Sequence, residues 1–192
     1  MKRIGITGGL GSGKSYICRL IEEMGYPVLD TDTVAKDIMS TDPTLKKQVI
    51  HLFGEQAYFK NGTLNRAHLA EIIFSDKEKR TQLNDHIHPA VYRAVDNWCA
   101  KQDSPLLFIE SALMIDTGYY KELDNIILVI TPIEERMERI LKIESHTLEE
   151  ILARINAQTD DTYKKRFADF VIDNAKGKDV AKQLKDILRV IG

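Results

Sequence analysis

The sequence predicts an α/β fold in which helices flank a five-stranded parallel sheet, giving three layers. Short apolar runs of the kind that form buried strands alternate with stretches of helical periodicity. Parallel strands need such helical crossovers between them. A glycine-rich segment directly follows the first apolar run, a position at which α/β proteins bind phosphate groups. The five predicted strands are residues 4–7, 26–29, 105–110, 125–130 and 170–172.

The glycine-rich segment Gly8–Ser15 has the pattern G-x-x-x-x-G-K-[ST], between the first strand and a helix predicted over 14–24. Glycines let backbone N–H groups turn inward, Lys14 can reach the β and γ phosphates, and the Ser15 hydroxyl can hold a magnesium ion. The segment therefore predicts a P-loop NTPase core that binds ATP and Mg²⁺. The expected ATP contacts from this segment are Gly9, Gly11, Ser12, Gly13, Lys14, Ser15 and Tyr16. A glycine-rich turn that only caps the helix is the alternative.

Two acidic residues, Asp30 and Asp32, follow the second predicted strand. Ligands of parallel α/β sheets bind beyond the carboxyl ends of the strands. We therefore expect these carboxylates beside the phosphate loop, with at least one of them on substrate or metal. The alternative is that Asp30 or Thr31 only caps the helix predicted over 33–39.

Residues from Ser40 to about Lys101 form a charged, helical stretch with no good strand candidate, which indicates an insertion. One helix is predicted over 65–74, and a longer apolar pattern follows from Leu83 to Trp98. Pro89 lies inside that pattern and is expected to kink or restart the helix, with His86 and His88 at the break. Two histidines two residues apart do not share a helix face, so a metal site is disfavoured there. A structural histidine and a substrate contact both remain open.

The segment 132–167, between the fourth and fifth strands, is predicted to form two charged helices, the second starting with a Thr147–Glu150 capping box. Arg136 and Arg139 can share a helix face, as can Arg154 and Gln158. In a small phosphotransferase, a lid with cationic residues covers the triphosphate at this position. The alternative is a solvated helix face whose arginines pair with neighbouring glutamates.

The composition excludes several classes of protein. A formal net charge of −2 gives no general attraction to nucleic acid, and no signal peptide or membrane span is visible, so a cytoplasmic protein is expected. The two cysteines show neither a disulfide framework nor a metal-ligand spacing and are expected to be buried thiols. We expect a monomer or a weak homo-oligomer.

The remaining sequence narrows the type of nucleotide-binding protein. The base-reading Asn-Lys-x-Asp segment of GTPases is absent, and Glu110 is the only approximation to the strand-end acid pair of motor ATPases. Small size, acids after the second strand, a helical insertion and an arginine-bearing segment favour a small-molecule kinase. A kinase for another small acceptor and a regulatory nucleotide-binding module are the alternatives.

An ordered set of motifs resembles the dephospho-CoA kinases, which phosphorylate the ribose 3′-hydroxyl of dephospho-CoA. The resemblance covers nearly the whole chain. It rests on IGITGGLGSGKS at 4–15, DTD at 30–32, GTLNR at 62–66, HP at 88–89, RINAQ at 154–158 and ADFVIDN at 168–174. It implies one P-loop kinase domain with three parts: a nucleotide-binding core (1–39, 102–131 and 168–192), an acceptor insertion (40–101) and a lid (132–167).

The resemblance also implies roles for individual residues. Asp32 corresponds to the general base or the carboxylate that orients the hydroxyl, with Asp30 as its companion. Lys14 would stabilise the transferring phosphoryl group, Ser15 would hold Mg²⁺, and Arg139 would close over the transfer. The segment from Asn174 to Gly177 would border adenine, and Arg66 and His88 would contact the acceptor.

The chain departs from the family pattern at three places. Tyr16 stands where many members have threonine, and Asp116 takes the place of a glutamate. Lys142 and Ile143 occupy the region of a second lid arginine. A lysine keeps the charge but cannot form a bidentate fork, so more weight falls on Arg139.

Overall fold

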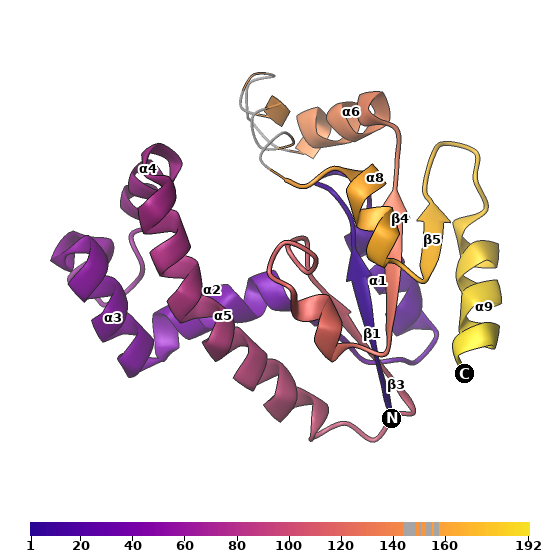
Figure 1. Ribbon diagram of the computed structural model, residues 1–192, viewed down its shortest axis with the longest axis horizontal. Helices are drawn as coiled ribbons and strands as arrows, with labels where there is room; N and C mark the ends of the chain where they lie inside the picture. Colours follow the sequence, from indigo (N-terminus) through magenta and orange to yellow (C-terminus); the bar gives the residue numbers. More distant parts are fainter. Residues whose placement is uncertain (144–148, 150, 153–154, 156–157) are drawn as a thin grey trace. The chain divides into compact units, whose positions relative to one another are not determined.

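The computed structural model describes residues 1–192 except 144–148, 150, 153–154 and 156–157. The chain divides into two compact units, one of Met1–Asp30 with Gln102–Gly192 and one of Thr31–Lys101. Figure 1 labels the elements of both units. No helix that the structure describes combines the length and apolar character that crossing a bilayer requires.

The first unit is built on the predicted five-stranded parallel sheet, with strand order β2-β3-β1-β4-β5. The strands are β1 (Lys2–Thr7), β2 (Val28–Asp30), β3 (Leu106–Glu110), β4 (Asn125–Ile130) and β5 (Phe170–Asp173). Their neighbours in this unit are α1 (Lys14–Glu23), η2 (Tyr119–Glu122), α6 (Ile133–Ile143), α8 (Asp161–Lys164), η3 (Lys165–Phe167) and α9 (Val180–Ile191). The apolar runs thus form strands because both of their faces are covered.

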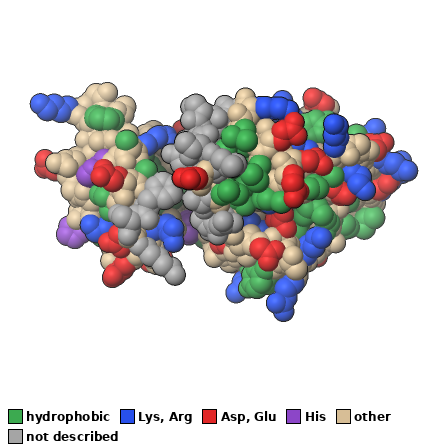
Figure 2. Space-filling model, turned by 90° about the horizontal axis from the view of Figure 1, so that it is seen from above, with side chains coloured by type: hydrophobic (Ala, Val, Ile, Leu, Met, Phe, Trp, Pro, Cys, Tyr) green, Lys and Arg blue, Asp and Glu red, His purple; other side chains and the backbone are tan. Residues whose placement is uncertain are grey.

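Helices α1 and α9 cover one face of the sheet. Ile17 and Ile21 of α1 and Leu184 of α9 are fully buried in one cluster with the side chains of the strands. The segment that leads to η2 packs against the other face, where a side chain on Gly5 would come within 2.4 Å of the Met114 sulfur. The central strand therefore needs a glycine at this position. In Figure 2, acidic and basic side chains are interspersed over the visible face of this unit.

The second unit is helical. It contains α2 (Thr31–Thr41), α3 (Pro43–Phe53), η1 (Glu55–Ala57), α4 (Arg66–Ser75) and α5 (Lys77–Cys99). Helices α2, α3 and α4 each pack against α5. The hydroxyl of Tyr58, which follows η1, donates a hydrogen bond to the carbonyl of Met39 in α2. The insertion was expected to begin near residue 40, whereas this unit begins at Thr31 because α2 packs on α5.

Two details differ from the expectation. Helix α2 starts directly after β2, so that Asp32 lies in its first turn and not in a preceding loop. Helix α5 runs unbroken through Pro89, so His86 and His88 lie within a helix and not at a break. Proline removes one backbone hydrogen bond, while the apolar face of α5 stays buried on both sides of it, at Ile87 and Val91.

Candidate active site

The phosphate loop connects β1 to α1 in a conformation that only glycine adopts easily. Gly11 and Gly13 have φ angles of 76° and 93°, in the left-handed region. Gly13 precedes the first residue of α1, and no side chain caps that helix end. The Tyr16 N–H donates to the Gly13 carbonyl at 3.0 Å, so the N–H groups of Lys14 and Ser15 are the ones that can bind an anion at this helix end, helped by the helix dipole.

The carbonyl of Ser12 ties this loop to the ends of β4 and β5. It accepts hydrogen bonds from the Thr131 hydroxyl at 2.9 Å and from the Asn174 side-chain amide at 2.8 Å. Asn174, which was expected near adenine, is 8 % exposed and uses its amide on the loop itself. Gly177 lies in the loop that follows, exposed and at a φ of 82°.

Lys14 and Ser15 begin α1, directly after the phosphate loop. The Lys14 Nζ is 3.5 Å from the Gly9 carbonyl, and the Ser15 hydroxyl is 3.5 Å from Glu110 Oε1. Asp30 is the register partner of Glu110 on the neighbouring strand, so two carboxylates end side by side at this edge. Glu110 was not among the expected site residues. Its position at the end of an apolar strand was nevertheless a sequence signal for a site carboxylate.

The oxygen donors of this edge fit a magnesium ion. Mg²⁺ prefers a hydroxyl, carboxylates, water and substrate phosphates to an all-protein cage. Among the residues that the structure describes, no three His, Cys, Asp or Glu side chains form a metal site. Ser15, with Glu110 behind it, would therefore hold the ion only together with the phosphates.

Cys18 packs directly beneath this edge. Burial raises the pKa of its thiol well above the usual range, and the nearby Glu110 carboxylate raises it further. Cys18 and Cys99 are both buried and free. Cys18 therefore stays protonated and serves as packing, as was expected for both cysteines.

Arg139 of α6 is held against the site by three groups. Its guanidinium donates to the Asn174 carbonyl at 2.7 Å and to the Thr131 hydroxyl at 3.3 Å, and it pairs with Glu135 at 3.3 Å. The side chain is 34 % exposed. Arg139 thus lies beside the phosphate loop, next to two of the residues that anchor Ser12.

Three side chains that the sequence did not single out as site residues also reach this area. Arg136 donates from Nε to the Leu10 carbonyl at 2.7 Å, and Gln158 accepts from the Leu10 N–H at 2.8 Å. Lys164 is fully buried, with Nζ 3.4 Å from the Ala112 carbonyl. Thr131 could have been found, because it directly follows β4. The sequence placed Arg136 and Gln158 on helix faces of the expected lid without predicting a contact with Leu10, and Lys164 gave no local signal.

The other predicted site residues lie in the second unit, each on a different helix. Asp32 is on α2, Arg66 begins α4 and His88 is on α5. Asp32 and Arg66 are exposed. Burial lowers the pKa of His88, and the Asp85 charge opposes that shift in part. The ring of His88 stacks on Tyr92 with centroids 6.1 Å apart.

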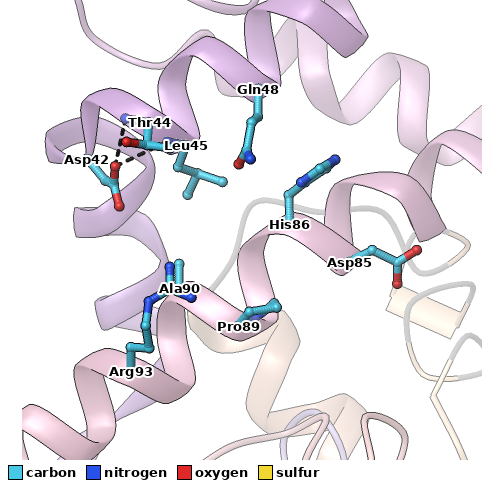
Figure 3. Close-up of a pocket in the computed structure, with 9 residues that line it drawn as sticks. All are labelled: Asp42, Thr44, Leu45, Gln48, Asp85, His86, Pro89, Ala90 and Arg93. Carbon is cyan, nitrogen blue, oxygen red and sulfur yellow. Dashed lines mark hydrogen bonds between the residues drawn. The ribbon is translucent and has the colours of Figure 1, made fainter.

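A pocket of about 220 Å³ opens between α3 and α5 (Figure 3). Gln48 comes from α3 and His86 from α5, and both line the same space. Arg66 and His88 do not line this pocket. The expected acceptor contacts and the pocket are thus formed by different residues.

Part of the expected lid lies outside the described residues. This applies to Arg154 and to the Thr147–Glu150 capping box. It also applies to Asn156 and Ala157 of the RINAQ motif.

A phosphate loop at the end of the central strand of a β2-β3-β1-β4-β5 parallel sheet defines a P-loop kinase fold. The profile described as dephospho-CoA kinase matches residues 2–179. The chain belongs to the dephospho-CoA kinase family, the ATP-dependent kinases of the final step of coenzyme A biosynthesis.

Relatives of similar length support this assignment. A dephospho-CoA kinase of Bacteroides fragilis is 37 % identical over 187 residues, which cover 97 % of this chain and 91 % of the relative. One from Listeria innocua is 36 % identical over 193 residues, covering 99 % and 96 %.

Solved structures agree in fold. A crystal structure from Thermus thermophilus superimposes with a TM-score of 0.84 at 33 % sequence identity. The match covers 99 % of this chain and 95 % of the Thermus chain. Shikimate kinase from Acinetobacter baumannii, in complex with shikimate, superimposes with a TM-score of 0.55 at 17 % sequence identity. The match covers 100 % of this chain and 93 % of the shikimate kinase chain, and it is a similarity of fold alone.

Proposed function

We propose that this chain transfers the γ-phosphoryl group of ATP to the ribose 3′-hydroxyl of dephospho-CoA, giving CoA and ADP. The observation that carries the proposal is the phosphate loop, with Lys14 and Ser15 beside the strand-end carboxylates Asp30 and Glu110, in a chain of this family. Such a site positions a triphosphate for in-line attack.

In the proposed step, the Asp32 carboxylate accepts the proton of the 3′-hydroxyl while that oxygen attacks the γ-phosphorus. The bond from the γ-phosphorus to the β–γ bridging oxygen breaks, and ADP leaves with the electron pair. Lys14 and Arg139 are the cations that stabilise the charge on the transferring group. Ser15 would hold Mg²⁺, which would supply positive charge to the phosphates of ATP.

The proposal gives the second unit the task of holding the acceptor. Arg66 is exposed and has no ion-pair partner among the described residues, which suits the diphosphate of dephospho-CoA. His88 is the second proposed acceptor contact. Asn174 and Gly177 are assigned to the adenine side of ATP, and Gly9, Gly11, Ser12, Gly13 and Tyr16 to the rest of its site. A cytoplasmic location and a monomeric or weakly associating state stay predictions.

The test is ADP formation, followed by a coupled assay, across a panel of acceptors with Mg²⁺ and with EDTA. We expect turnover with dephospho-CoA that depends on Mg²⁺ and none with shikimate or nucleoside monophosphates. Equal ADP formation with all acceptors, or with none present, would contradict the acceptor assignment. Phosphate placement on the 3′-oxygen is checked by phosphorus NMR of the product.

A further inference from the structure

Both backbone polar groups of Leu10, at the tip of the phosphate loop, are held by side chains from distant parts of the chain. The Leu10 N–H donates to Gln158 Oε1 at 2.8 Å, and the Leu10 carbonyl accepts from Arg136 Nε at 2.7 Å. We call these two side chains the Leu10 clamp. Within the loop, Ser12 N–H donates to the Gly9 carbonyl at 3.1 Å. Side chains from outside the loop thus satisfy the two polar backbone groups of Leu10, which form no hydrogen bond within the loop.

Arg136 is built firmly into this position. It is only 7 % exposed, and Nη1 pairs with Asp161 at 3.3 Å. Its guanidinium also lies against Gly9, since a side chain there would come within 2.1 Å of Nη2. A buried, paired guanidinium keeps one geometry, because any other leaves a buried charge without its partner.

The clamp does not compete with the phosphates for the loop. Gln158 occupies the Leu10 N–H, while the N–H groups of Lys14 and Ser15 at the start of α1 have no side-chain cap and stay available for an anion. Phosphate binding depends on those later groups pointing inward, which the conformation of the tip determines. Both hydrogen bonds of the clamp end on Leu10, so they act on ATP through the conformation of the loop.

We propose that Arg136 and Gln158 are positioning residues that hold the phosphate loop in its ATP-binding conformation. The inference rests on the proposed function in taking ATP as the nucleotide. It predicts a specific kinetic signature, because a misplaced loop affects ATP and not the acceptor.

The experiment compares Gln158→Met and Arg136→Met with the wild-type protein by calorimetric titration with ATP and Mg²⁺, without acceptor. Each variant should bind ATP about tenfold more weakly, the loss expected for one buried hydrogen bond. The KM for dephospho-CoA should stay within about twofold, since uniform binding of the acceptor is untouched. Arg136→Lys keeps a charge and a donor and should recover part of the affinity.

Two further variants make the result decisive. Arg189→Met removes an exposed ion pair on α9, with Asp186, and should leave ATP affinity unchanged. The double variant Arg136→Met/Gln158→Met should lose less affinity than the product of the single losses, since both act on one residue. Thermal melts identify variants that do not fold. If Arg136→Met is one of these, the half-buried Gln158 still carries the test.

Unchanged ATP affinity in Gln158→Met would overturn the proposal, as would an equal rise in KM for both substrates. Because the titration needs no acceptor, its result tests the role of the clamp independently of the proposed function. A wild-type protein that binds ATP but phosphorylates no dephospho-CoA would contradict the function and leave the clamp to be judged by the titration.

Discussion

Lys164 brings a positive charge into a fully buried position close to the phosphate loop. Burial lowers the pKa of its ammonium group, and the charges of Asp116 and Asp161 oppose that shift. Lys14 and Arg136 lie near enough to lower it further, so three cations share this region. The mutual repulsion of such a cluster of cations is energetically unfavourable without a bound anion. A polyphosphate would compensate the charge and make the cluster favourable.

Asp32 is the residue whose proposed role is most directly testable. Asp32→Asn removes the proton acceptor and keeps the size of the side chain. We expect kcat to fall about 100-fold or more, with the KM for ATP nearly unchanged, because the loss concerns the transition state. Steady-state kinetics with both substrates measures this.

Asp37→Asn on the same helix is the matched control, since Asp37 is also exposed on α2. It should leave kcat within about twofold of wild type. Full activity of Asp32→Asn would move the base to another carboxylate, Asp30 or Glu110.

His88 predicts a pH dependence of stability. Its folded pKa lies below the ordinary value, chiefly through burial, so the unfolded chain binds a proton at a pH where the folded protein does not. The free energy of unfolding should therefore fall as the pH drops below about 6.5 and through the folded pKa. His88→Phe keeps a ring beside Tyr92 and should show a smaller loss between pH 7.5 and 5.5.

Urea unfolding at both pH values checks this prediction. The single tryptophan, Trp98, lies on the same helix as His88, so its fluorescence follows the second unit. An identical loss in wild type and variant would show that His88 does not contribute.

Among the elements, the loop between β1 and α1 is the most constrained by geometry. Gly13 has a φ of 93°, and a side chain there would lie 2.1 Å from the Asn174 amide nitrogen. Gly13→Ala should weaken ATP binding by about 10- to 100-fold, because it adds backbone strain and disturbs the hydrogen bond to Ser12. Calorimetric titration with ATP measures the loss.

Gly25→Ala provides the control for backbone strain alone. Gly25 has a φ of 88° just beyond the end of α1, with nothing within 4 Å of an added side chain. It should lower the melting temperature and leave ATP affinity intact. If both variants bound ATP like the wild type, the Asn174 contact would have no part in shaping the loop.

The helices, strands and loops differ in how well the sequence predicts them. The phosphate loop and the five strands could be predicted because their signals are local: a motif, or an apolar run. The start of α2 at Thr31 and the continuity of α5 through Pro89 depend on packing within the second unit, which no local pattern reports. Contacts of Arg136 and Gln158 with Leu10 join residues 126 and 148 positions apart, beyond any sequence spacing rule.

At the scale of the whole molecule, the division into two units leads to a prediction about ligand protection. The side chains that hold the phosphate loop, Thr131, Arg136, Asn174 and Gln158, all belong to the first unit. Arg66 and His88 belong to the second, which has its own core around α5. Each substrate should therefore protect mainly one unit when it binds alone.

Hydrogen exchange of the full chain tests this with a non-hydrolysable ATP analogue and with dephospho-CoA, added separately. At about 100 times its Kd, a ligand stabilises the structure it binds by about 2.7 kcal/mol, so amides that exchange by opening of that unit should slow about 100-fold. The analogue should slow exchange at β1, the phosphate loop and α1, and dephospho-CoA should do so in α2–α5. Protection by dephospho-CoA that is confined to the first unit would place the acceptor there and contradict the role proposed for Arg66 and His88.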